Sequence, residues 1–130
     1  MSQDRGTASL ELAIVAPALM LLVLGVLQFG LWYHAQNVVQ AAALEGARVA
    51  AAEDGTAGSG KSRALEVVRE GLGGAADDQG ATASVGPDAA HVRVTAELAG
   101  LLPIPGLSSF SLSSEATVFR ERFRPAEEQQ

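Results

Sequence analysis

The chain has 130 residues, which leaves room for one small domain, and its net charge is -6 at pH 7. This acidic balance, with no basic stripe, excludes nucleic acid as a partner. Cysteine is absent, which excludes disulfides and thiolate chemistry, so an extracytoplasmic domain has to be held by packing or by its neighbours.

An apolar run from Leu12 to Tyr33 dominates the N-terminal part, and Gln28 is its only strongly polar side chain. Its 22 residues would span about 33 Å as a helix, close to the roughly 30 Å of a bilayer core. A cleaved secretory signal has a shorter apolar region, and a buried soluble helix has polar positions on one face. We therefore predict a retained, single-pass membrane span at 12–33.

Orientation follows from the flanking charges. Arg5 is the only basic side chain before the span, and no Lys or Arg follows until Arg48. The positive-inside rule then favours an N-terminus in the cytoplasm, with Trp32 and Tyr33 as aromatics of the outer interface. The prediction is a single-pass protein of the cytoplasmic membrane whose C-terminal part lies outside the cell.

An alanine-rich stretch continues the helix beyond the membrane. Apolar residues recur at helical spacing until the stop signal Asp54-Gly55, which predicts one helix over 7–53 of about 70 Å. Pro17 is expected to kink it within the membrane. Gly25 and Gly30 weaken it and permit close contacts with other helices.

The remaining residues predict a small extracytoplasmic α+β domain over 54–124, followed by a disordered tail at 125–130. A flexible connector is expected at 56–60, then a short amphipathic helix over 61–72 with an apolar stripe of Ala64, Leu65, Val68 and Leu72. A polar loop at 77–80 precedes strands at 81–85, 91–98 and 110–119. The fold predicted is a three-stranded antiparallel sheet with one face covered by the helices.

The segment between the last two strands is unusually apolar for a loop. Leu101, Leu102 and Ile104 either cap the small core or form a contact patch for a neighbouring subunit or the membrane surface.

No pattern in the sequence indicates catalysis. His34 lies beside the aromatic belt and His91 on the outer face of a strand, so no metal-ligand spacing arises. No nucleophile elbow or phosphate-binding loop is present. We predict no enzymatic activity, no metal site and no cofactor.

Glu11 is a carboxylate at the N-terminal edge of the span. An acid at such a position is a functional hypothesis, because a charge in lipid is costly. The alternative is a first-turn residue that reaches the interface and is favoured by the helix dipole. Glu11 also lies five residues after Gly6.

Three stretches, 5–17, 28–30 and 42–50, resemble TadE-like proteins, which are pseudopilins or minor pilins of tight-adherence (Flp-type) pilus systems. The resemblance covers about residues 5–52. It implies a short leader over 1–6, cleavage by a prepilin peptidase after Gly6, and a new N-terminus at Thr7, which makes Glu11 the fifth residue. The implied partners are other pilins or pseudopilins, the assembly platform and the lipid bilayer.

The function expected is therefore a membrane-anchored pseudopilin or minor pilin that enters or primes a pilus or a related envelope machine. The alternative is a signal-anchored envelope binding domain that is never processed and never polymerises. A holin-like, membrane-active protein is a third hypothesis, against which the sheet-forming half argues.

Overall fold

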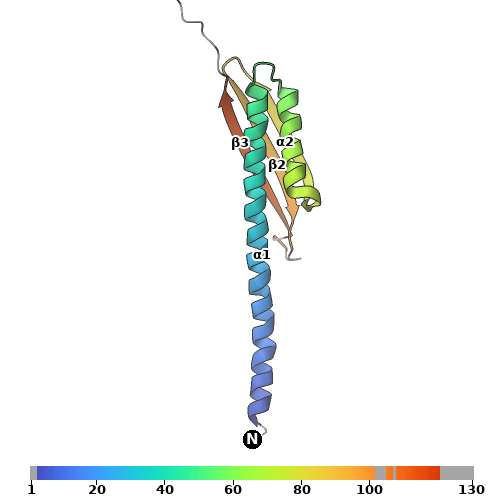
Figure 1. The fold of residues 1–130 in the computed structure, drawn as a ribbon. Helices are drawn as coiled ribbons and strands as arrows, with labels where there is room; N and C mark the ends of the chain where they lie inside the picture. The colour runs from blue at the N-terminus through green and yellow to red at the C-terminus, as the bar shows by residue number, and fades with distance from the viewer. Residues whose placement is uncertain (1–2, 102–104, 107, 121–130) are drawn as a thin grey trace, which may run out of the picture.

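The computed structural model describes residues 3–101, 105–106 and 108–120, with side chains from Ser9 onward. Figure 1 shows a single long helix whose C-terminal half packs on a small domain, while its N-terminal half stands alone. The elements in chain order are α1 (Gln3–Ala51), α2 (Ala57–Leu72), a 3-10 turn η1 (Gly73–Ala75), β1 (Ala76–Val85), β2 (Ala89–Ala99) and β3 (Ser109–Phe119). The predicted α+β architecture is confirmed.

Helix α1 begins at Gln3 and ends at Ala51, close to the expected 7–53. It runs without a break across the boundary between the predicted leader and the predicted helix. Cleavage after Gly6 stays a prediction. The helical assignment of α1 also continues through Pro17, whose missing N–H removes one backbone hydrogen bond. The predicted kink at this proline stays a prediction. The expected tail at 125–130 lies outside the described residues.

The sheet has the order β1-β2-β3 and is antiparallel throughout. Side chains of β2 alternate between buried and exposed, which confirms the predicted period of two. The predicted polar loop at 77–80 is wrong, because these residues continue β1 and pair with the C-terminal part of β2. A register irregularity between Ala76 and Asp78 accommodates the polar start of the strand.

Helix α2 begins earlier than the sequence predicted. The expected connector at 56–60 is wrong, because Thr56 is the N-cap and forms a capping box with Ser59. The Ser59 backbone N–H donates to Thr56 Oγ1 at 3.1 Å, and the Thr56 N–H donates to Ser59 Oγ at 3.0 Å. The helix therefore starts at Ala57, and Gly60 lies inside it and is buried.

The core between the helices and the sheet is built from small side chains. Its largest fully buried members are Val39, Val68, Val92 and Val94, and no described polar side chain is buried. The α1 residues that reach this core follow the helical period and are all alanine or valine: Ala35, Val39, Ala42, Ala43, Ala47 and Ala50. A core of small residues requires the backbones to approach closely.

That close approach occurs where α1 crosses α2. A Cβ added at Gly46 would lie 2.8 Å from the Gly60 carbonyl oxygen, and one at Gly60 would lie 2.7 Å from the Gly46 carbonyl oxygen. Neither position therefore has space for a side chain. The two glycines let the helices touch through their backbones and bring both onto the sheet.

The far end of the domain is closed by Arg120, just after β3. Its Nη2 donates to the carbonyl oxygens of Ala52 and Glu53, at 3.3 and 3.2 Å. These carbonyls lie just beyond the last residue of α1, at the negative end of the helix dipole, so a cation is favourable there. Arg120 thereby joins the end of the sheet to the end of the long helix.

Candidate functional site

The N-terminal half of α1 contributes no fully buried side chain to the core of the domain. From Ser9 to His34 every side chain is exposed except Leu24 and Gln28, which are half-buried. The helix is long and apolar enough to cross a membrane, and none of its most apolar stretch is buried. A core helix of a soluble protein is mostly buried, so this single apolar helix indicates membrane anchoring.

The predicted processing and assembly residues lie at the free end of this helix. Gly6 and Thr7 belong to the helical backbone of α1. Glu11 follows one turn later and is exposed. No hydrogen bond or ion pair joins its carboxylate to another described side chain. Among the described side chains, therefore, Glu11 has no partner that would give it a structural role.

The two glycines of the apolar half face open space. A Cβ added at Gly25 or at Gly30 would meet nothing within 4 Å, in contrast to Gly46 in the domain. Among the described residues, therefore, no other element packs so closely against these two glycines that a side chain would be excluded. Their predicted use, close contact with another helix, stays a prediction.

Gln28 is the polar residue whose role the sequence did not reveal. The backbone N–H of Leu101, which follows β2, donates to Gln28 Oε1 at 2.7 Å. This contact joins residues 73 apart in sequence and brings the beginning of the β2–β3 connection against the apolar half of α1. The sequence did show Gln28 as the single strongly polar side chain in the apolar run. It could not show the partner, because a backbone N–H is present at almost every residue and produces no sequence pattern.

The predicted contact loop is described only in part. Leu101 is 48% exposed and so does not cap the core as a buried residue. Leu102 and Ile104 lie outside the described residues.

Aromatic side chains mark the junction between the free half of α1 and the domain. The ring of Phe29 lies 5.9 Å from that of Trp32 and 6.5 Å from that of Tyr33, measured between centroids. One residue later, His34 Nε2 donates to the Gly71 carbonyl oxygen in the last turn of α2, at 3.2 Å. His34 is therefore more than an interfacial residue, because it joins α1 to the end of α2.

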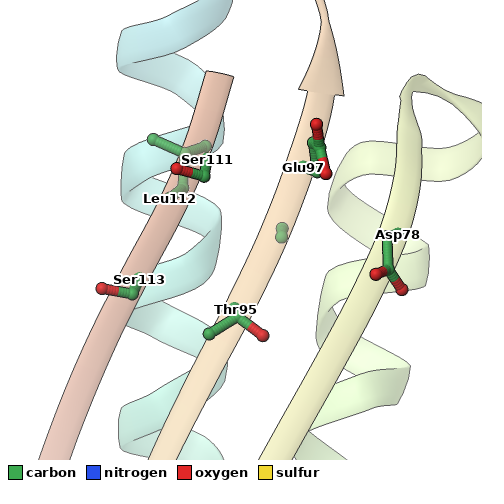
Figure 2. A pocket seen from close by; sticks show the side chains of 7 residues that line it. Asp78, Thr95, Glu97, Ser111, Leu112 and Ser113 are labelled. Atoms are coloured by element: carbon green, nitrogen blue, oxygen red, sulfur yellow. The ribbon is translucent and has the colours of Figure 1, made fainter. Parts of the chain in front are cut away.

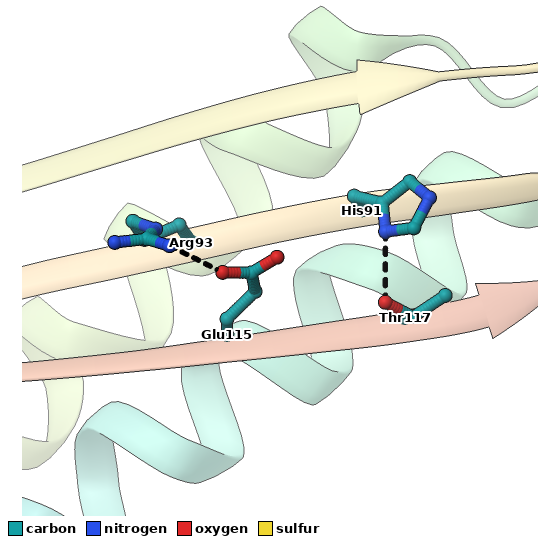
Figure 3. Close-up of polar contacts among 4 residues, drawn as sticks. All are labelled: His91, Arg93, Glu115 and Thr117. Atoms are coloured by element: carbon teal, nitrogen blue, oxygen red, sulfur yellow. Dashed lines mark hydrogen bonds and ion pairs between the residues drawn. The ribbon is translucent and has the colours of Figure 1, made fainter.

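The outer face of the sheet carries polar side chains that pair across neighbouring strands (Figure 3). Arg93 of β2 donates to Glu115 of β3 at 2.6 Å, and His91 Nδ1 shares a hydrogen bond of 2.8 Å with Thr117 Oγ1. Each pair is directly opposite in the strand register. Such pairs are ordinary cross-strand stabilisation on a solvated face.

An open depression on the same face is lined by polar residues from all three strands (Figure 2). Asp78 and Glu97 are opposite each other across β1 and β2, with Ser111 and Ser113 beside them on β3. The described residues contain no group of three or more His, Cys, Asp or Glu side chains placed to hold a metal ion. The described lining contains no histidine or lysine beside these hydroxyls.

The helix surfaces carry two further ion pairs, Arg48 with Glu45 at 3.0 Å and Arg63 with Glu66 at 2.9 Å. The hydrogen bond from Arg63 to Glu66 raises the pKa of the guanidinium above its ordinary value. Both pairs are solvent-exposed and three residues apart, so they contribute little to stability.

Comparison with known families points to the N-terminal helix. The family described as TadE-like protein matches residues 6–48, which confirms the resemblance predicted from the sequence. No curated protein and no solved structure matches the chain. The match covers nearly all of α1, including Gly6, Glu11 and Pro17, and indicates a protein associated with a Tad-type pilus.

Proposed function

We propose that this TadE-like chain is a pseudopilin or minor pilin, anchored in the cytoplasmic membrane by α1 and joined to a pilus or a related envelope machine by helix packing. The observation that carries this proposal is a division within α1. The TadE-like match covers residues 6–48, yet the domain buries side chains of α1 only from Ala35 onward. Most matched residues before Ala35 are exposed, apart from the contacts of Gln28 and His34, and are therefore available to something outside the chain.

The surface offered by that free half suits packing between helices in lipid. Lipid tails are as apolar as leucine side chains, so association there depends on close van der Waals contact and on small residues. Gly25 and Gly30 are exposed, and among the described residues nothing from outside the local helix lies within 4 Å of a Cβ placed at either. A second helix can approach the backbone of α1 at both positions.

Glu11 supplies the polar part of the proposed contact. A carboxylate at the centre of a bilayer costs about 2.5 kcal/mol or more, and less near the interface. Cleavage after Gly6 would create an ammonium group at Thr7, and the Thr7 ammonium of one subunit would neutralise the Glu11 carboxylate of its neighbour. A buried ion pair is favourable only with good geometry, so this pair would set the register between subunits more than the stability.

The remaining parts of the proposal concern topology and partners. The N-terminus lies in the cytoplasm, where a prepilin peptidase reaches Gly6, and the domain lies outside. The partners are other pilins or pseudopilins and the assembly platform. The protein has no enzymatic activity of its own, and its domain presents the polar sheet face to the surroundings.

Mass spectrometry of the native protein tests the processing step. Protein from a strain with an active prepilin peptidase is expected to begin at Thr7, and protein from a peptidase-deficient strain is expected to keep residues 1–6. Gly6→Ala should preserve the unprocessed mass in both strains. An intact N-terminus in the peptidase-positive strain refutes processing and favours the alternative, a signal-anchored binding domain that does not polymerise.

A further inference from the structure

We propose that the beginning of the β2–β3 connection, at Gly100 and Leu101, is a second membrane contact that seats the domain in the outer lipid interface. The occupant of this surface is the boundary between phospholipid headgroups and acyl chains. The proposal rests on membrane anchoring by α1, which belongs to the proposed function, and requires neither processing nor assembly.

The depth of Leu101 follows from its hydrogen bond to Gln28. A helix along the membrane normal that enters the hydrocarbon at Leu12 needs about 20 residues to cross roughly 30 Å, so it leaves near Leu31. Gln28 then lies about 4.5 Å inside the outer hydrocarbon boundary. The Leu101 amide, 2.7 Å from Gln28 Oε1, lies at the same level. The domain therefore cannot stand clear of the membrane.

Both backbone N–H groups at this point have partners within the protein, as a water-poor site favours. The Leu101 N–H donates to Gln28, and the Gly100 N–H donates to the Ser108 carbonyl oxygen at 2.8 Å. Irregular backbone at membrane depth is tolerated only where its polar groups have partners within the protein. This explains the single glutamine in the apolar run, because Gln28 provides the acceptor for the Leu101 N–H.

The side chains around this contact suit lipid rather than one protein surface. Leu101 is 48% exposed, and Phe29, Trp32 and Tyr33, which follow Gln28 along α1, are exposed as well. From Ser9 to His34 exposed side chains cover every side of α1, apart from the stripe of Leu24 and Gln28. A second copy of the chain would cover one side, whereas a bilayer surrounds the helix. Aromatic residues concentrate at the headgroup level.

The opposite end of the domain lies far from the apolar half of α1, so the end with Gly100 and Leu101 is the one that faces the membrane. At that end the turn between β1 and β2 lies beside the end of α1, far from the apolar half (Figure 1). Arg120 lies there too, hydrogen-bonded to the carbonyl oxygen of Ala52. Phe119 ends β3 at this opposite end, about 34 Å along the strand from Ser109. It is 77% exposed and provides a control position that should remain outside the lipid.

Depth-dependent fluorescence quenching tests this seating, because Trp32 is the only tryptophan of the chain. The full chain is reconstituted into phosphatidylcholine–phosphatidylglycerol vesicles whose acyl chains carry bromine near the headgroup or near the bilayer centre. Three proteins are compared: the native chain, the double variant Trp32→Phe with Leu101→Trp, and the double variant Trp32→Phe with Phe119→Trp. Circular dichroism checks that each variant is folded.

The expected result is strong quenching of the native Trp32 and of the tryptophan at position 101 by the shallow bromines. Quenching at position 101 should be at least threefold stronger than at position 119, where aqueous iodide should quench instead. Adding Gln28→Leu to the position-101 variant should reduce its lipid quenching, because the chain loses its acceptor.

Three outcomes overturn the proposal. If Trp32 is quenched but position 101 responds like position 119, the domain stands clear of the lipid and only this inference fails. If position 101 is protected from both quenchers at high protein-to-lipid ratio and loses that protection on dilution with lipid, a neighbouring copy covers it. Absence of quenching at Trp32 itself removes membrane anchoring, and with it both this inference and the proposed function.

Discussion

Replacing Gly46 by alanine should destabilise the domain, although alanine is the better helix former. A Cβ at this position would lie 2.8 Å from the Gly60 carbonyl oxygen, 2.9 Å from Ala64 Cβ and 3.2 Å from Val92 Cγ1. Two of these neighbours are backbone or Cβ atoms, which cannot move without shifting α2. Overpacking of this kind costs about 1–3 kcal/mol, against a gain of roughly 0.5–1 kcal/mol from helix propensity. The net expectation is a loss of about 1–2 kcal/mol.

Gly58→Ala in α2 is the matched control, because its nearest neighbour is Thr56 Oγ1 at 3.7 Å. Thermal unfolding of the full chain in detergent, followed by circular dichroism, should show a midpoint lower by about 4–8 °C per kcal/mol for Gly46→Ala. The control should be unchanged or slightly higher. If Gly46→Ala unfolds at or above the native midpoint, the close backbone contact between α1 and α2 does not control the stability of the domain.

Three further substitutions test the cap of α2, the contact of Arg120 with the end of α1, and Glu11. Thr56→Ala removes the cap of α2 and should lower the unfolding free energy by about 1 kcal/mol in chemical denaturation; Ser62→Ala, on the exposed side of α2, is the comparison that should show no such loss. Arg120→Ala removes the guanidinium donor from the carbonyls of Ala52 and Glu53, although the Ala52 carbonyl keeps the Gly55 N–H, and should cost about 1 kcal/mol. Equal hydrogen exchange at the end of α1 in both proteins would contradict that role. Glu11→Ala should still insert into membranes, as measured by fractionation, but should reduce the amount of protein in sheared pili, and undiminished assembly would remove Glu11 from the mechanism.

Periodicity along the chain was sufficient to predict most of the fold. The alternation from His91 to Leu98 indicated a strand with one buried face, and the structure buries Val92, Val94 and Leu98 on that face. The alanine-rich continuation of α1 was equally clear. These patterns are local, since each residue reports only on which side of its own element meets the core.

Two errors of prediction have a common cause. The residues at 77–80 are polar and contain a glycine, so they indicated a loop, but pairing with β2 makes them strand. The residues at 56–60 are small and polar, so they indicated a connector, but the capping box and the contact of Gly60 with α1 make them helix. In both segments tertiary contact outweighed weak local propensity.

The sequence by itself determined the apolar run of α1, its length and the position of Glu11 five residues after Gly6, because these depend only on residue type and spacing. Only the tertiary structure decided what Gln28 does. Its partner is the backbone amide of Leu101, and a backbone group has no side-chain identity by which the pairing can be recognised. That contact sets the level at which the domain meets the apolar half of α1.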